Sequence, residues 1–202
     1  MDTLALVGTA LGLGIAAGLS LYGTAFLTGL AIHLGWVRLA PAWEPLAVLA
    51  DPLVLVLSGA LFAIEFLADK IPWVDSAWDA VHTVIRPVGG ALLAMRVLGD
   101  LAPAAEVVAF LLLGGATLAT HSAKASVRVV VNTSPEPVSN ILVSLGENGL
   151  LAGAVWLALV HPFWTLILGL GAVALAVTVT AWLAGRALRV LRRSWGRSAS
   201  RS

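Results

Sequence analysis

The feature that most constrains this chain is an apolar segment, residues 4–37, that contains no Asp, Glu, Lys or Arg. A continuous α-helix of this length would measure about 50 Å, because an α-helix rises about 1.5 Å per residue. The hydrocarbon core of a bilayer is only about 30 Å thick. One straight helix therefore does not fit, and we expect a kink or break at the stretch GLSLYG, residues 18–23.

The composition extends this conclusion to the whole chain. Hydrophobic residues make up 59% of the sequence and charged residues 11%, whereas a typical soluble domain is about 45–50% apolar and about 25% charged. The alternating segments of a transmembrane β-barrel do not occur, and the absence of cysteine excludes disulfides and thiolate metal sites. We therefore predict an all-α fold, a polytopic transmembrane helical bundle in contact with the lipid bilayer.

Further apolar stretches and a basic terminus predict the topology. The apolar stretches lie at residues 46–68, 104–120, 138–160 and 165–185. We predict a single transmembrane domain, 1–190, whose first segment is retained rather than cleaved as a signal peptide, and a basic tail, 191–202. The arginines near this end are Arg186, Arg189, Arg192, Arg193, Arg197 and Arg201. Positive charge beside a span stays in the cytoplasm, so we place the C-terminus there, against anionic lipid and with no nucleic-acid partner.

Two polar stripes interrupt the apolar pattern at helical spacing. Residues 72–86 read as an amphipathic helix that Pro72 can begin and Pro87 ends. Its polar face carries the first stripe: Asp75, Asp79, His82 and Arg86. The second stripe also follows a helical spacing, i, i+3, i+7 and i+11, and is mainly basic: His121, Lys124, Arg128 and Asn132. Ionisable groups at membrane depth face an interior and pair with one another, so we expect the two stripes to exchange ion pairs.

The stretch NTSPEPVSN, residues 132–140, is the second unusual feature. Pro137 can open a helix, and a similar proline occurs at Pro87, in PVGGALLA. These matches suggest two related repeats, about 46–98 and about 104–158, with proline-broken or re-entrant helices that begin at the two prolines. Paired breaks of this kind mark binding sites in transporters, where irregular backbone lines a cavity.

The candidate site consists of the ionisable and polar residues in and between these stripes. For binding or coupling we predict Glu65, Asp69, Lys70, Asp79, His82, Arg86, His121, Lys124, Arg128, Asn132, Ser134, Glu136, Asn140 and Glu147. Lys70 and Asp75 fit an aqueous loop equally well. His82 and His121 are the best placed to titrate near neutral pH, whereas His33 is expected at the interface and His161 in a turn. No cofactor is expected, and the wide spacing of the histidines disfavours zinc.

Three long segments resemble a bacterial membrane family, "domain of unknown function 4126". They are LGLGIAAGLSLYGTAFLTGLAIHLG, EFLADKIPWVDSAWDAVHTVIRPVGGALLA and HSAKASVRVVVNTSPEPVSNILVSLGENG. The resemblance covers roughly residues 5–185 and implies a small integral protein of the bacterial inner membrane, with no activity to carry over. The chain has GENG where this family's pattern suggests an acidic pair, which draws attention to Glu147.

Three functions fit these features. The first is a small secondary transporter or channel-like protein, proton-coupled, for an anionic or phosphate-bearing solute or lipid. The second is a membrane enzyme that acts on a lipid phosphate or diphosphate with Mg²⁺ on Asp69, Asp75 and Asp79. The third is a non-catalytic assembly partner, whose charges form structural pairs such as Asp79 with Arg128. Small residues at 8–19 and 165–175 also suit a homo-oligomeric contact.

Overall fold

The computed structural model describes residues 3–39, 41–132 and 137–199, with the side chains of 137, 187, 188 and 190–199 left out. The described residues form helices and no strand, which confirms the all-α prediction. The helices are α1 (Thr3–Leu19), α2 (Leu21–His33), the 3₁₀ helix η1 (Pro41–Ala50), α3 (Pro52–Ala68), α4 (Pro72–Met95), α5 (Pro103–Asn132), α6 (Pro137–Val160) and α7 (Pro162–Ala199). The predicted site residues Ser134 and Glu136 lie outside the described residues.

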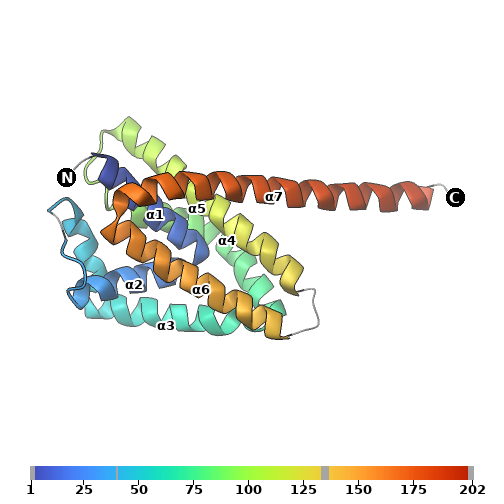
Figure 1. Cartoon of the computed structure of the whole chain (residues 1–202), viewed down its shortest axis with the longest axis horizontal. Helices are drawn as coiled ribbons and strands as arrows, with labels where there is room; N and C mark the ends of the chain where they lie inside the picture. Colours follow the sequence, from blue (N-terminus) through green and yellow to red (C-terminus); the bar gives the residue numbers. More distant parts are fainter. Residues whose placement is uncertain (1–2, 40, 133–136, 200–202) are drawn as a thin grey trace.

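The long N-terminal apolar segment breaks where it was expected to. Ser20 separates α1 from α2 in an extended conformation, and its hydroxyl accepts a hydrogen bond of 2.9 Å from the amide of Gly23. α1 then lies at the centre of the bundle, in contact with α4, α5, α6 and α7 (Figure 1). A Cβ at Gly18 would lie 2.6 Å from the Thr117 carbonyl oxygen. The small residues of 8–19 are thus used for packing inside the chain, and the prediction that they form an oligomer contact is wrong.

Several helices are suited to crossing a membrane. Among the described residues, three are long and apolar enough, Pro103–Asn132, Val138–Val160 and Pro162–Arg186. A fourth span arises if η1 and α3 are counted together, although these two helices meet at an angle of 67°. The break lies at Asp51, whose carboxylate caps α3. Residues 46–68 are therefore bent rather than the single straight span that their composition predicts.

Pro87 does not have the role predicted for it. α4 runs through Pro87 to Met95 as one helix of 24 residues, so the prediction that this proline ends one helix and starts another is wrong. Proline lacks an N–H and so removes one intrahelical bond, but a helix packed among neighbours inside a bilayer tolerates this. Pro137, by contrast, does begin α6. Pro87 thus lies inside a helix, whereas Pro137 lies at the start of one. The internal repeat stays a prediction.

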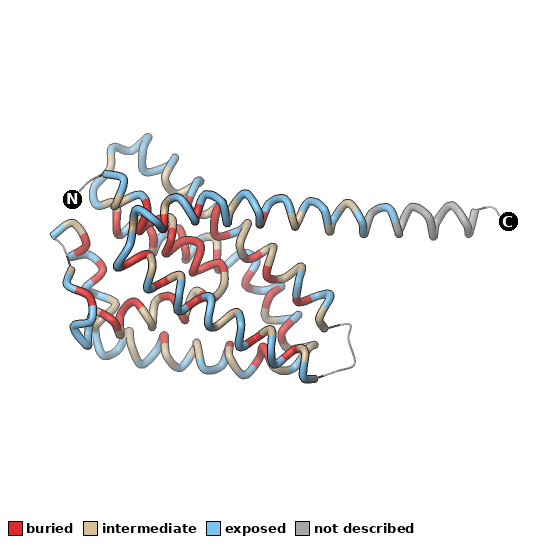
Figure 2. Tube along the Cα trace, viewed as in Figure 1, coloured by how far each residue is buried: buried red, intermediate tan, exposed pale blue. Residues whose placement is uncertain are grey.

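The distribution of buried residues is that of a membrane protein. Large apolar side chains on the outer faces are exposed, for example Leu53 at 66% and Leu112 at 68%. Charged side chains lie inside instead, and Arg86 and Asp75 are both 0% exposed. Figure 2 shows the buried residues along the inner sides of the helices. The chain is therefore a multi-pass membrane protein whose outer surface meets lipid.

Exposed tryptophans mark two levels along the bundle. Trp164 opens α7 and Trp182 lies 18 residues later on the same helix, both more than half exposed. At about 1.5 Å per residue they are about 27 Å apart, close to the hydrocarbon thickness of a bilayer. Trp73, at the first turn of α4, is 76% exposed. Tryptophan prefers the membrane–water interface, so the first turn of α4 is best placed near the head groups.

Candidate functional site

The two polar stripes face one another across the contact between α4 and α5. The helices run in opposite directions, so the start of one stripe meets the end of the other. At one end the Asn132 amide nitrogen donates to Asp75, at 2.8 Å. At the other end Arg86 donates to Nδ1 of His121, at 2.7 Å. Arg86 follows Asp75 by eleven positions on α4, so the stripes reach about 16 Å into the bundle.

Arg86 is the cation at the inner end of this network. Its guanidinium binds Glu65 on α3 at 2.5 Å and Asp79, two turns earlier on α4, at 3.2 Å. It also lies 3.4 Å from the carbonyl oxygen of Gly18, at the end of α1. A fully buried guanidinium needs such partners, because removing it from water is costly. Arg86 thus ties together three helices around the break between α1 and α2.

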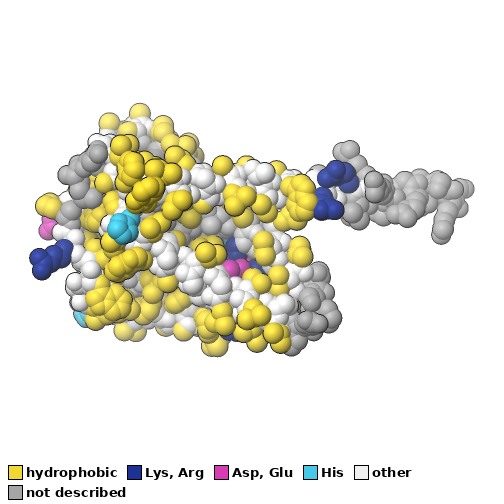
Figure 3. Space-filling model, viewed as in Figure 1, with side chains coloured by type: hydrophobic (Ala, Val, Ile, Leu, Met, Phe, Trp, Pro, Cys, Tyr) yellow, Lys and Arg dark blue, Asp and Glu magenta, His cyan; other side chains and the backbone are white. Residues whose placement is uncertain are grey.

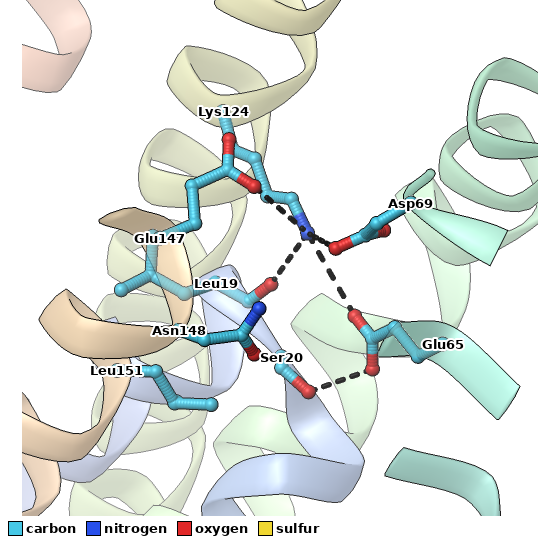
Figure 4. A pocket seen from close by; sticks show the side chains of 8 residues that line it. All are labelled: Leu19, Ser20, Glu65, Asp69, Lys124, Glu147, Asn148 and Leu151. Atoms are coloured by element: carbon cyan, nitrogen blue, oxygen red, sulfur yellow. Dashed lines mark hydrogen bonds and ion pairs between the residues drawn. The ribbon is translucent and has the colours of Figure 1, made fainter. Parts of the chain in front are cut away.

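Lys124 lies in the middle of the network, and Figure 4 shows its Nζ between three carboxylates, two from the end of α3 and one from α6. The distances from Nζ are 3.8 Å to Glu65, 3.6 Å to Asp69 and 3.8 Å to Glu147. Nζ also donates a hydrogen bond of 3.1 Å to the carbonyl oxygen of Leu19. The ammonium is thus shared by three acids without a close pair to any of them.

Arg128 is the third cation and has the most contacts. It binds Glu147 at 2.7 Å and Asp69 at 3.2 Å, and donates to Oδ1 of Asn140 at 2.7 Å. Asp75 is more distant, at 3.9 Å. The sequence suggested Asp79 as a structural partner of Arg128, but the structure pairs Asp79 with Arg86. That suggested pairing is therefore wrong.

The charges of this network do not balance. Five buried or nearly buried carboxylates are shared by three cations, Arg86, Lys124 and Arg128. The acids are Glu65, Asp69, Asp75, Asp79 and Glu147. Two negative charges therefore lack a cation when every acid is ionised, or one if Lys70 at the edge is included. One oxygen each of Asp69, Asp75 and Asp79 is also buried without a hydrogen-bond partner. Each of these oxygens could carry a proton or accept one from water.

The hydrogen bonds around His121 define its protonation. Arg86 can only donate, so Nδ1 of His121 must be an acceptor. Thr83 uses its single hydroxyl proton on the carbonyl oxygen of Asp79, at 2.9 Å. Nε2 of His121, 3.1 Å from the same hydroxyl, therefore donates to it. His121 is thus the neutral Nε2–H tautomer here, and a second proton would have to displace the Arg86 contact.

His82 lies beside the ion pairs rather than in them. Its Nδ1 donates to the carbonyl oxygen of Trp78, at 2.7 Å, and its ring stacks on the Trp78 ring with centroids 4.5 Å apart. Nε2 lies 3.2 Å from the hydroxyl of Tyr22 on α2. In the neutral ring Nε2 accepts from that hydroxyl. His82 therefore links α4 to α2 and is separate from the carboxylates.

Lys70 lies at the outer edge of the network. Its Nζ donates to Oγ of Ser144, at 2.8 Å, and to the carbonyl oxygen of Phe66, at 3.1 Å. No described carboxylate lies within ion-pair distance of it. Burial lowers the pKa of Lys70 below its ordinary value, and the nearby Asp69 carboxylate partly opposes this. Lys70 is thus a cation at the edge of the site that forms none of its ion pairs.

Most of the predicted site residues converge in this network. Those in it are Glu65, Asp69, Asp79, Arg86, His121, Lys124, Arg128, Asn132, Asn140 and Glu147. Lys70 and His82 lie at its edges. The prediction missed Asp75, which is fully buried, and Ser20, whose hydroxyl donates to Glu65 at 2.6 Å. Asp75 lies on the first stripe, and this helical spacing could have identified it as a site residue.

Little free space lies inside the network. A cavity of about 10 Å³ lies among Glu65, Asp69, Lys124 and Glu147, which is about the volume that one water molecule needs. A groove of about 210 Å³ lies between α4 and α5 and is lined by residues that include Asp79 and Arg128. Figure 3 shows acidic and basic side chains together in a gap of the mainly apolar face. The network is thus nearly closed but lies close to the surface.

The aspartates that a magnesium site would need do not converge. Asp69 faces Arg128 and Lys124, Asp75 faces Asn132, and Asp79 faces Arg86. Over the residues that the structure describes, no three His, Asp or Glu side chains are grouped as they would be around a metal ion. The geometry therefore does not support the magnesium site that the lipid-phosphate enzyme would need on these three aspartates.

Comparisons with known proteins agree with the sequence resemblance. Neither a curated protein nor a solved structure matches the chain. A family model described as "Domain of unknown function (DUF4126)" matches residues 7–182. This match begins in the first turns of α1, covers α2 to α6 and ends within α7, and it includes every residue of the charged network. The chain therefore belongs to the family of unknown function DUF4126.

Proposed function

We propose that this protein is a small secondary transporter, or a channel-like protein, that couples proton binding to the movement of an anionic or phosphate-bearing solute or lipid. The observation that carries the proposal is the buried network of five carboxylates and three cations inside a lipid-facing bundle. Uncompensated charge at membrane depth is expensive and marks ion pathways and proton relays. Protons are the smallest species that can neutralise the excess acids.

The same contacts support coupling between a proton and an anion. Lys124 and Arg128 both contact Asp69 and Glu147. While these acids are ionised they occupy the two bases, and an anion would have to compete with them. A proton on either acid removes its negative charge and leaves the base free to bind an anionic group. Proton and anion would therefore bind together and move in the same direction.

The position of the network supports access from the side that we propose to be cytoplasmic. It lies around the last turns of α5 and the first turns of α4 and α6, towards the end of the bundle that α7 extends past (Figure 1). Arg186 and Arg189 follow Trp182 on α7, and cations beside a span favour the cytoplasm. At the other end an apolar core, which includes Leu13, Leu46 and Val97, closes the bundle. We propose that the membrane is the inner membrane of a bacterium.

Purified protein in liposomes tests this proposal. A pH-sensitive dye inside the liposomes reports proton uptake when inorganic phosphate, glutamate or a short-chain phosphonate is added outside. We expect at least one anion to drive proton uptake faster than in protein-free liposomes. The double variant Glu65→Gln, Lys124→Ala should abolish that uptake, whereas Asp100→Asn, an exposed acid at the other end of the bundle, should not. Undiminished uptake in the double variant would refute the roles assigned to these residues.

One observation favours a second candidate, a non-catalytic assembly partner. Each of the three cations already has carboxylate partners, and the cavity among them has room for about one water molecule. The network would then serve folding or subunit contact alone. Exchanging the charges of a close pair, Asp79→Arg with Arg86→Asp, tests this. A stable exchanged protein with no proton flux in either form would favour the structural role.

A further inference from the structure

Asp75 and Asn132 form a buried pair at the outer end of the network. Asp75 is 0% exposed, and its Oδ2 accepts a hydrogen bond of 2.8 Å from Nδ2 of Asn132. The same nitrogen donates to the carbonyl oxygen of Pro72, at 3.1 Å. Oδ1 of Asp75 and Oδ1 of Asn132 are both buried with no hydrogen-bond partner. Two acceptors on adjacent side chains thus lack a donor at the same place.

The charged groups around Asp75 do not supply that donor. Arg128 on α5 is the nearest cation, at 3.9 Å, and its guanidinium is held by Glu147 and Asp69 at shorter distances. Asp69, which caps the end of α3, and Asp79, one turn later on α4, both add negative charge. An ionised Asp75 would therefore be a fully buried carboxylate with one hydrogen bond and two acidic neighbours. Such a group is costly to leave charged.

We propose that Asp75 is a proton-binding site, at which a protonated carboxyl group pairs with the Asn132 amide. A single proton on Oδ1 of Asp75 supplies the missing donor, and Oδ1 of Asn132 is the acceptor without a partner. The amide nitrogen already donates in the opposite direction, so the acid and the amide would be joined by two hydrogen bonds. Protonation makes the network less negative by one charge, and no other ion has to enter the bundle.

The surroundings of the pair provide a route for this proton. Nδ2 of Asn132 also lies 3.2 Å from the hydroxyl of Ser76, which is exposed and lines the groove between α4 and α5. Asp79, whose Oδ2 lacks a partner, lines the same groove. A hydrated proton in the groove would transfer to Oδ1 of Asp75 and leave water behind. Asp75 is then the point at which protons enter the network, a role that rests on the proposed function.

Infrared difference spectroscopy on the whole protein in lipid nanodiscs tests the protonated pair without any transport. The C=O stretch of a protonated carboxyl group is separate from that of a carboxylate, and ¹³C-labelled aspartate assigns it to this residue type. We expect such a band to appear as the pH is lowered to mildly acidic values, to be lost in Asp75→Asn and to be unchanged in Asp100→Asn. Asn132→Ala removes the partner, so the remaining band should shift to higher frequency. A band that is undiminished in Asp75→Asn, or a spectrum without any protonated carboxyl even at mildly acidic pH, would overturn the site.

Proton uptake in liposomes then separates this inference from the proposed function. If Asp75 is where protons enter, Asp75→Asn should slow uptake at least tenfold. If Asp75→Asn loses the band but takes up protons as fast as wild type, the protonated pair is supported and its role in proton entry is overturned. If wild-type protein shows the band but no anion drives uptake, the transporter proposal fails and the proton-binding site stands.

Discussion

Replacing Arg86 with methionine is the sharpest test of how the network is held together. Methionine is of similar length and carries no charge, so the variant removes the guanidinium and keeps much of the packing. Glu65 and Asp79 then lose their contacts of 2.5 and 3.2 Å and stay buried, at 2% and 7% side-chain exposure. Breaking a buried ion pair from one side costs about 3–5 kcal/mol. We expect Arg86→Met to lower the free energy of unfolding by about that amount at neutral pH.

A second substitution shows whether the loss of stability comes from buried carboxylates that no longer contact the guanidinium. Glu65→Gln in the Arg86→Met background removes one of the two carboxylates that lost the guanidinium, so stability should recover by about 0.5–3 kcal/mol, the usual range of coupling between neighbours. The cost of Arg86→Met should also shrink as the pH falls, because protons can then replace the guanidinium as the neutralising charge. Glu65→Gln alone leaves Arg86 with Asp79 and should be milder.

Unfolding in mixed micelles, followed by the fluorescence of the eight tryptophans, measures these differences. Arg96→Met is the matched control, since Arg96 ends the same helix and is exposed. It should cost less than about 1 kcal/mol, the range for a cation at a helix C-terminus. If Arg86→Met is no more destabilising than Arg96→Met, or if Glu65→Gln deepens the loss, the network is not held by paired charge and the reasoning fails.

Other predictions follow from the helix break, the close packing of α1 and the topology. Ser20→Ala should cost about 1–2 kcal/mol in the same unfolding assay, because it removes both the cap on Gly23 and the donor to Glu65; a neutral result would contradict the role of the break. Gly18→Ala should cost about 1–3 kcal/mol through overpacking, while Gly115→Ala, with no atom within 4 Å of the added Cβ, should be tolerated. The chain has no cysteine, so single cysteines report topology. A membrane-impermeant maleimide should label Arg38→Cys in intact bacterial cells and Arg189→Cys only after permeabilisation, and the reverse pattern would invert the proposed orientation.

The sequence predicts the interior of this protein better than its helix ends. Helical spacing placed Asp79, Arg86, Lys124 and Arg128 on two stripes, and the structure joins those stripes directly. This works because lipid offers charged groups no alternative partner, so charges on one helix must meet charges on another. The predicted break at residues 18–23 succeeds for a similar reason, since the hydrocarbon thickness limits helix length.

What could not be predicted depends on tertiary contacts. Pro87 reads as the end of a helix, but α4 continues because its neighbours stabilise it and no water competes for its backbone. The pairing of Asp79 with Arg86 instead of Arg128 is decided by the relative position of α4 and α5. Burial of Asp75 depends on Asn132, which is 57 residues away in sequence. Helical periodicity gives the face of a residue but not its depth or its partner.

The break at Ser20 has a mechanical consequence for the chain. One hydroxyl both starts α2, through the amide of Gly23, and donates to the carboxylate of Glu65. The last carbonyls of α1, those of Gly18 and Leu19, accept from Arg86 and Lys124. Any change in the angle between α1 and α2 must therefore displace these contacts to Glu65, Arg86 and Lys124, and by reciprocity a change in the charges of the network must act on that angle. The short interruption that lets an over-long apolar segment fit the bilayer thus also makes its shape sensitive to charge.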